Sequence, residues 1–159
     1  MAGPEARLRE LGHELPPVPE PAGSYVPATR AGTLLFTAGQ VPIQGGELAK
    51  TGKVGDALTV EEAQEAARVC ALNALAAAAA EAGGLNNISR IVKVTGFVAS
   101  APGFNGQPQV LNGASDFLGE VFGEAGLHAR SAVGVAELPL DAPVEVELVV
   151  ELGGPSQPS

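Results

Sequence analysis

The first third of the chain alternates short β-rich runs with turn residues, which predicts two strands. Residues 24–29 and 33–37 are rich in tyrosine, valine, threonine, leucine and phenylalanine, and Ala31-Gly32 lies between them. Runs of this kind separated by a glycine-containing turn are typical of a β-hairpin. Residues 42–55 follow, and their many glycines predict a loop.

A long helix is predicted from Thr59 to the glycine pair at 83–84. Thr59 and Glu62 have the spacing of a capping box, in which both side chains satisfy backbone N–H groups at the helix start. Glycine is a suitable residue to end such a helix. One face carries only small side chains and can lie close against a sheet, namely Ala63, Ala66, Ala67, Cys70, Ala74 and Ala77.

The second half of the chain adds three more strands and another helix. Residues 88–99 predict a strand, and residues 101–109, with two prolines and two glycines, predict a loop. Between residues 110 and 122 apolar side chains recur every three or four positions, which indicates an amphipathic helix. Residues 131–137 and 144–151 predict the last strands. The short turn around residues 139–143 favours pairing these two strands as antiparallel neighbours.

These elements predict one α+β domain over residues 24–152. Their order is β-β-α-β-α-β-β, with two helices packed on one face of a mixed β-sheet. Residues 1–23 are predicted to be an N-terminal extension, with a helix at 5–11 and a proline-rich run at 16–21 that cannot form a ladder strand. Residues 153–159 are predicted to be a disordered tail.

The composition indicates a folded protein rather than a disordered or membrane-spanning one. Of 159 residues, 45% are hydrophobic and 17% charged, a balance that excludes a highly charged disordered chain. No apolar run is long enough to cross a bilayer, and the charged N-terminus lacks an apolar export signal. The single cysteine, Cys70, excludes an internal disulfide and any multi-cysteine metal site. We therefore expect a cytoplasmic protein.

The charge balance narrows the class of partners. The formal net charge is −9, with 9 lysines and arginines against 18 acidic residues. Nucleic-acid binding depends largely on the neutralisation of phosphates by basic side chains, so this field opposes a polyanion. There is no tryptophan and only one tyrosine, which leaves little for base stacking. A small anionic substrate remains compatible with a local positive pocket.

Most signatures of enzyme chemistry are missing from the sequence. It contains neither a phosphate-binding loop nor a dinucleotide-binding glycine pattern. His13 and His128 lack the spacing of metal ligands, so no metal site is predicted. Cys70 lies among alanines in a predicted helix, which favours a buried structural thiol over a nucleophile.

A group of charged residues near the C-terminus is the positive signal. In residues 144–148 the period of two places the apolar side chains on one face and Glu145 and Glu147 on the other. Arg130 immediately precedes the neighbouring predicted strand. Two interpretations are open: a charged cleft formed by Arg130 and a carboxylate, or an ordinary ion pair on the surface.

Four short segments resemble the Rid family, also called the YjgF-type or endoribonuclease L-PSP family. They are Gly-Ser-Tyr-Val-Pro-Ala at 23–28, Thr-Ala-Gly-Gln-Val-Pro at 37–42, Ala-Arg-Ser-Ala-Val-Gly-Val-Ala-Glu-Leu-Pro at 129–139 and Val-Glu-Val-Glu at 144–147. They occur in the family's order and span roughly residues 23–152. The long front end and the loop at 101–109 resemble a divergent branch.

The resemblance implies a fold, an assembly and a reaction. The fold is the chorismate-mutase-like α+β fold, and the assembly is a homotrimer with ligand clefts between subunits. The reaction is the hydrolysis of reactive 2-enamine or 2-imino acids, released by pyridoxal-phosphate enzymes, to 2-keto acids and ammonia. It needs neither a metal nor an organic cofactor.

The resemblance also assigns roles to individual residues. Arg130 matches the arginine that holds the substrate carboxylate, and Glu145 the acid that orients or deprotonates the attacking water. Tyr25 matches an aromatic residue near the cleft mouth, Gly39 a backbone contact in the pocket wall, and Asn112 the asparagine of the second helix. Structural roles are the alternatives: Tyr25 as cover for the core, Gly39 as a turn residue, and Glu145 as a solvated charge.

Three positions depart from the family's pattern. Ala38 stands where deaminases often have serine, and His128 stands where proline commonly precedes Ala-Arg. Ala132 stands where they often have cysteine. If that position acts through its backbone carbonyl, Ala132 keeps the role in substrate binding; if the thiol matters, activity falls.

Three classes of function are compatible with these residues. An imine or enamine deaminase predicts Arg130 and Glu145 within a few ångströms across a cleft between subunits. A non-catalytic trimer that binds a small carboxylate is the alternative that Ala38 and Ala132 support. An endoribonuclease, as one family name suggests, is disfavoured by the net charge and by the absence of a histidine pair.

Overall fold

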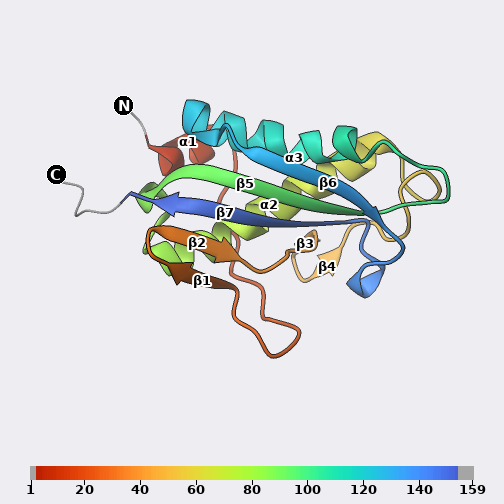
Figure 1. The fold of residues 1–159 in the computed structure, drawn as a ribbon, viewed down its shortest axis with the longest axis horizontal. Coiled ribbons are helices and arrows are strands. Elements are labelled where there is room, and N and C mark those ends of the chain that lie inside the picture. The colour runs from red at the N-terminus through yellow and green to blue at the C-terminus, as the bar shows by residue number, and fades with distance from the viewer. Residues whose placement is uncertain (1–2, 154–159) are drawn as a thin grey trace.

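Two long helices lie on one face of a five-stranded sheet in the computed structural model, which describes residues 3–153 (Figure 1). The helices are α2 (Val60–Ala82) and α3 (Gln107–Phe122). The sheet has the order β1 (Ala28–Ala31), β2 (Leu34–Thr37), β7 (Val144–Leu152), β5 (Ile88–Ala99) and β6 (Ala129–Val135). The pair β5–β6 is parallel and the others are antiparallel. The predicted α+β class, with two helices on one face of a mixed sheet, is confirmed.

The remaining elements are short. They are α1 (Pro4–Glu10), the hairpin β3 (Ile43–Gln44) and β4 (Glu47–Leu48), and 3-10 turns at Leu85–Asn87, Gly123–Gly126 and Pro139–Asp141. The β3–β4 hairpin falls within the segment predicted to be a loop. Of the predicted disordered tail, residues 154–159 lie outside the described part of the chain.

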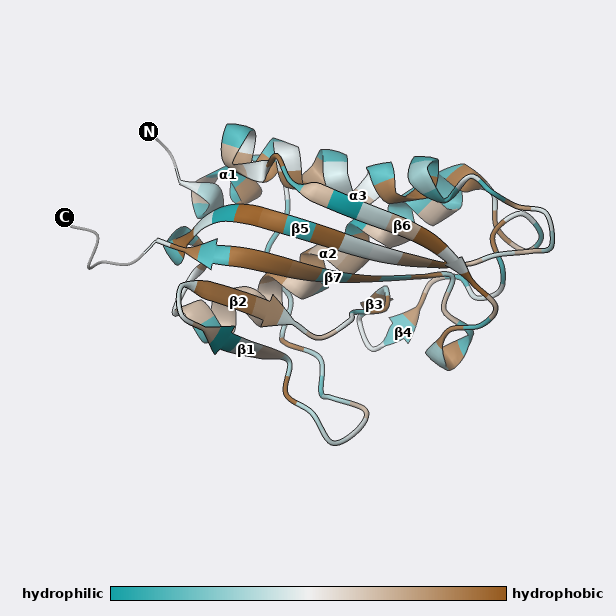
Figure 2. Ribbon diagram, in the orientation of Figure 1, coloured by the Kyte–Doolittle hydropathy of each residue, from teal (hydrophilic) through white to brown (hydrophobic). Residues whose placement is uncertain are grey.

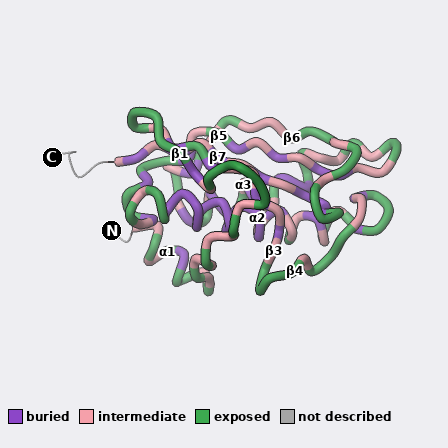
Figure 3. The backbone as a smooth tube through the Cα atoms, turned by 90° about the horizontal axis from the view of Figure 1, so that it is seen from below, coloured by how far each residue is buried: buried purple, intermediate pink, exposed green. Residues whose placement is uncertain are grey.

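The core lies between the sheet and the two long helices. Along β7, Val144, Val146 and Leu148 are buried against the helices, as the period of two predicts. Long stretches of β5 and β7 are hydrophobic in Figure 2, and Figure 3 shows the buried positions between the strands and α2 and α3. The opposite side, which we call the open face, carries Glu145 and Glu147 and is not covered by a helix in the described part of the chain.

The predicted ends of α2 are confirmed. Thr59 Oγ1 accepts a hydrogen bond from the Glu62 N–H at 3.1 Å, and the Glu62 carboxylate accepts one from the Thr59 N–H at 3.0 Å. Gly83 ends the helix with φ at +84°, a left-handed conformation that favours glycine. The small face is also confirmed, because Ala67, Cys70 and others on it are fully buried.

Gly113 on α3 sets how closely the two long helices approach. A Cβ atom at this position would overlap the backbone carbonyl oxygen of Gln64 on α2. We expect Gly113→Ala to lower the free energy of unfolding by about 1–3 kcal/mol, because the backbone of α2 must move. Gly119→Ala on the same helix meets nothing within 4 Å and is the matched control. It is expected to raise stability by up to about 1 kcal/mol through helix propensity. Urea unfolding of both variants measures the difference, and equal effects would contradict the close approach.

The predicted pairing of the last two strands is wrong. Strands β6 and β7 are not neighbours, because β5 lies between them and pairs with both. The helix α3 joins β5 to β6 as a crossover, and such a crossover makes the two strands parallel. The connection from β6 to β7 then passes the end of β5 and returns antiparallel on its other edge. Strands β6 and β7 both pair with β5 instead of with each other, and β5 is 12 residues long and hydrogen-bonded along both edges.

Several boundaries also differ from the predictions. The first strand begins at Ala28 rather than at residue 24, and β6 covers Ala129–Val135 rather than 131–137. Helix α3 begins at Gln107 rather than at residue 110. Pro108 does not prevent this earlier start, because it falls in the first turn, where proline is tolerated.

The N-terminal segment packs on the domain. Leu8 of α1 is buried in the core, and Arg7 Nε donates a hydrogen bond to the Glu120 carbonyl of α3 at 2.9 Å. The His13 ring packs edge-on against Phe117, with ring centroids 5.5 Å apart. The division of the chain at residue 23 stays a prediction. Among the described residues, no helix is both long enough and apolar enough to cross a membrane.

Candidate functional site

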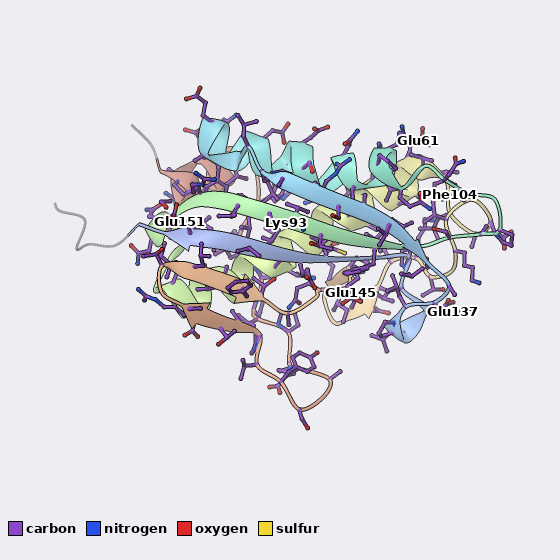
Figure 4. All side chains as sticks on the ribbon, viewed as in Figure 1. Glu61, Lys93, Phe104, Glu137, Glu145 and Glu151 are labelled. Atoms are coloured by element: carbon purple, nitrogen blue, oxygen red, sulfur yellow. The ribbon has the colours of Figure 1, made fainter. Side chains whose placement is uncertain are left out.

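A cavity of about 190 Å³ brings together three of the predicted site residues: Tyr25, Gly39 and Glu145. Tyr25 comes from the loop before β1 and Gly39 from the segment after β2. Glu145 comes from the start of β7, where Figure 4 labels it. The segment after β2 is tied to β7 by two backbone hydrogen bonds between Gln40 and Val146, at 2.8 and 3.0 Å. This bridge holds Gly39 beside Glu145.

Gly39 is needed for the position of the Glu145 carboxylate. A Cβ atom at position 39 would overlap Oε2 of Glu145. The close approach therefore has a steric reason beyond a turn, and it places the backbone of Gly39 in the wall of the cavity.

The Glu145 carboxyl has a perturbed acidity. Burial raises its pKa, and the neighbouring Glu147 carboxylate adds to the rise. A carboxyl that is partly buried in a cleft and has a raised pKa suits proton transfer. It is the shared face of β7 that brings the two acids together.

Prolines and a leucine form the other walls of the cavity. Pro19, Pro21 and Leu140 line it, and the Tyr25 hydroxyl accepts a hydrogen bond from the Ala22 N–H at 3.1 Å. The proline-rich run therefore belongs to the candidate site, which the sequence interpretation missed. Its only signal in the sequence was the rigidity of the run, and rigidity does not indicate which surface a segment faces.

A second group of predicted residues gathers around Arg130 at the other edge of the sheet. Arg130 Nη1 donates hydrogen bonds to Asn112 Oδ1 at 2.8 Å and to Ser115 Oγ at 3.1 Å, and Nη2 donates to the Pro108 carbonyl at 3.2 Å. All three acceptors belong to α3. The parallel register places Arg130 beside Val94 of the core, so its side chain is on the helix side of the sheet.

His128 extends this group through Ser115. The His128 Nδ1 lies 2.6 Å from the Gly126 carbonyl, and its Nε2 lies 2.9 Å from Ser115 Oγ. A neutral imidazole satisfies both contacts if Nδ1–H donates and Nε2 accepts the Ser115 hydroxyl proton. Ser115 Oγ is then free to accept from Arg130. The residue that replaces the family's proline thus supports the arginine indirectly.

Ala132 shares a strand face with Arg130. It lies two residues further along β6, opposite Gly96, and packs against the core. At Gly96 a Cβ atom would overlap the Leu111 side chain, so this part of the sheet lies close to α3.

The prediction of a charged cleft between neighbouring strands of one chain is therefore wrong. Arg130 contacts α3 on the helix side of the sheet, whereas Glu145 faces the open side, and β5 separates their strands. In the register, Arg130 lies opposite Val94, and Glu145 lies opposite Phe97. One chain carries two separate groups: the acid group (Tyr25, Gly39, Glu145) and the arginine group (Arg130, Asn112, Ser115, His128).

The residues considered for other chemistry have structural surroundings. Cys70 is fully buried, its thiol donates to the Val144 carbonyl at 3.4 Å, and burial raises its pKa well above the usual range. The burial predicted for Cys70 is confirmed. Within residues 3–153, no three His, Cys, Asp or Glu side chains group as metal ligands.

Comparison with known proteins identifies the family to which the chain belongs. Residues 5–152 match the family model described as YjgF/chorismate mutase-like, putative endoribonuclease. The chain belongs to the YjgF/Rid family. The resemblance seen in the four sequence segments is confirmed, and so is the chorismate-mutase-like fold. The match to this YjgF/Rid model begins at residue 5, so it includes all of α1 except Pro4, and the proline-rich run.

Three relatives illustrate how closely this YjgF/Rid chain resembles known members. Protein TCP17 of Trypanosoma cruzi is 47% identical over 148 residues, which are 92% of each chain. The 2-iminobutanoate/2-iminopropanoate deaminase of Dermatophagoides farinae is 33% identical over 85% of this chain and 91% of its own. The crystal structure of a putative endoribonuclease from Shewanella oneidensis superposes with a TM-score of 0.92, at 38% identity, over 95% of this chain and 100% of its own.

Proposed function

We propose that the protein hydrolyses reactive 2-imino acids, and their 2-enamine tautomers, to 2-keto acids and ammonia. The observation that carries the proposal is the gathering of Tyr25, Gly39 and Glu145 around one cavity, with the acidity of Glu145 altered by burial. A family relative named as an imine deaminase, at 33% identity, supports the same reaction.

Arg130 is proposed to hold the substrate carboxylate. A guanidinium has five N–H groups, and contacts with Asn112, Ser115 and Pro108 use three of them. Among the described residues, the Nε–H and one Nη2–H have no acceptor. Two N–H groups of one guanidinium can bind both oxygens of a carboxylate, and such charge-assisted pairs are strong and directional.

Glu145 is proposed to act on the attacking water. Its carboxylate accepts a proton from water while the oxygen adds to C2 of the imine, and the C=N bond becomes a C–N single bond. Glu145 passes this proton to the nitrogen, which gives a neutral adduct with one hydroxyl and one amino group on C2. The carboxylate then transfers the hydroxyl proton to the same nitrogen while the C=O bond forms and the C–N bond breaks. One imine and one water give one 2-keto acid and one ammonia, and the acid is regenerated. General base catalysis typically contributes about 10²–10⁴-fold to such a step.

The complete site is proposed to lie between subunits of a homotrimer. The acid group and the arginine group occupy opposite faces of the sheet within one chain, so a single chain cannot bring both to one small substrate. A neighbouring copy, with its arginine group against the acid group of the first, would bring them together. The resemblance to the Rid family implies the same assembly.

Loss of 2-imino acid in a coupled assay tests the reaction. An amino-acid oxidase generates the imine, semicarbazide competes for it, and purified protein is expected to suppress semicarbazone formation. Arg9→Ala, in the exposed part of α1, is a control that should retain full activity. No suppression with several amino acids would refute the deaminase and favour the carboxylate-binding trimer.

Mixing two weakly active variants tests the shared site. Arg130→Ala and Glu145→Gln each damage one group, so each alone is expected to retain only about a hundredth of the wild-type activity. In a random equimolar trimer, a subunit interface with an intact arginine and an intact acid forms in about one case in four, by the symmetry of the ring. Co-expression of the two variants should therefore restore about a quarter of the wild-type kcat per site. A mixture that is no more active than either variant alone would contradict a site shared between subunits.

A further inference from the structure

Two consecutive residues in the turn before β7 adopt a left-handed backbone. The φ angles are +63° at Leu140 and +59° at Asp141, and no other non-glycine residue among residues 3–153 has a positive φ. This region crowds the Cβ atom of an L-residue, and leucine has no side-chain hydrogen bond to offset the cost. Backbone hydrogen bonds hold the turn: Gly52 N–H donates to the Asp141 carbonyl at 2.9 Å, and Ala142 N–H to Pro139 at 3.1 Å.

Packing in the core does not explain why leucine occupies this strained position. The residue Leu140 is 65% exposed and lies outside the buried core. It lines the cavity that also contains Glu145 and Gly39. Strained residues cluster at functional sites, where the surrounding structure holds them for a purpose other than stability. Here the strain presents an aliphatic side chain to the cavity of the acid group.

We propose that Leu140 is a specificity-determining residue whose side chain makes the site favour a long aliphatic side chain on the substrate over a methyl group. This inference rests on the proposed hydrolysis of imines. Most of the other lining residues are apolar, among them Pro19, Val41 and Ile43. Burial of an aliphatic side chain against them removes it from water, and this transfer has a favourable free energy. The carboxylates of Glu20 and Glu145 disfavour an acidic side chain in the same space.

Two glycine variants of the same turn separate the side chain from the backbone. Leu140→Gly removes the aliphatic side chain and accommodates the positive φ. Asp141→Gly relieves the same kind of strain one residue later and keeps Leu140, and Asp141 does not line the cavity. Both variants are expected to fold, since glycine adopts this backbone region readily. Thermal unfolding of both verifies this.

The measured quantity is the ratio of kcat/KM for the leucine-derived imine to that for the alanine-derived imine. We expect Leu140→Gly to lower this ratio about tenfold, in the range known for the loss of aliphatic contacts in a pocket. Asp141→Gly should leave it within twofold of wild type. An unchanged ratio in Leu140→Gly, or the same fall in both variants, would overturn the role of the Leu140 side chain.

Binding of the product class gives a readout that does not need turnover. Calorimetric titration with 4-methyl-2-oxopentanoate and with pyruvate measures the same preference as a ratio of Kd values. If the wild type hydrolyses no imine yet prefers the longer acid, and only Leu140→Gly removes this preference, the proposed reaction fails and the role of Leu140 stands. If the wild type hydrolyses imines and neither ratio changes in Leu140→Gly, the reaction stands and the role of Leu140 fails. If neither acid binds, the role of Leu140 is refuted as well.

Discussion

Replacing Arg130 by alanine is expected to lower kcat/KM for imine hydrolysis about 100-fold, the loss typical of one strong charge-assisted contact. The side chain lies at the edge of the sheet and is partly exposed, so the fold and the proposed trimer should persist. The contacts with Asn112 and Ser115 orient the guanidinium before a substrate arrives. Coupled imine assays and light scattering on the same preparation measure activity and assembly together.

Arg130→Lys separates the charge from the shape of the guanidinium. Lysine keeps a positive charge but cannot offer two fixed N–H groups to one carboxylate. We therefore expect activity between that of wild type and that of Arg130→Ala, with most of the loss in KM. Full activity in Arg130→Ala would remove the arginine group from the site and with it the proposed function.

Replacing Glu145 by glutamine should lower kcat about 100-fold and leave KM within about twofold, because the amide keeps the shape but cannot accept the proton. The pKa of Glu145 is raised above the ordinary glutamate value of 4.5 by burial and by Glu147. The base is active only when it is deprotonated. The wild-type rate should therefore fall as the pH drops through this raised pKa, at a higher pH than an ordinary glutamate would give. Steady-state rates from pH 4 to 8 measure this limb. An unchanged kcat in Glu145→Gln would show that this acid does not take part.

Glu147→Gln is the matched control on the same face of β7. It removes the second cause of the raised pKa and keeps the Glu145 carboxyl, so the acid limb of the rate should move to lower pH while the plateau stays. An acid limb that does not move would show that Glu147 has no influence on Glu145.

The contribution of Glu145 to the free energy of unfolding should fall as the pH rises, whereas the rate of hydrolysis should rise. A carboxyl whose pKa is raised in the folded state binds its proton more tightly there than in the unfolded chain. Its contribution to stability is present below the unfolded pKa and is lost as the pH rises through the folded pKa. At pH 8 the wild type must hold an ionised, partly buried carboxylate beside Glu147, which lowers its stability. Glu145→Gln has no charge at this position, so it should be more stable than wild type at pH 8. The difference should shrink toward pH 4.

The local elements of the fold could be predicted because their determinants are close together in the chain. The capping box of Thr59 and Glu62 involves residues three positions apart, and the left-handed end of α2 needs only Gly83. The buried face of β7 follows from the alternation of its own side chains. The four segments that resemble the Rid family are also local, and they were sufficient to identify the family.

The arrangement of the site depended on contacts between residues far apart in the chain. The sequence alone indicated that Glu145 and Arg130 are candidates, but not that they lie on opposite faces of the sheet. That follows from the register, because β5 pairs Arg130 with Val94 and Glu145 with Phe97, and residues 94 and 97 face opposite sides of the strand. The two residues are also separated across the sheet, because β5 pairs with both β6 and β7 along its two edges. A local turn signal cannot encode which of two edges a later strand will occupy.

The walls of the cavity were decided in the same way. The resemblance implied that Gly39 lies in the pocket wall, with a turn residue as the alternative, and the Gln40–Val146 bridge brings it against Glu145. The proline-rich run reads as an accessory until it folds over the cavity, and Leu140 reads as ordinary until its backbone angle is known. The sequence alone therefore determined the long helices, the strands of the main sheet, the family and the candidate residues. Tertiary structure decided their relative positions, because these depend on long-range pairing and steric fit that no short stretch of chain contains.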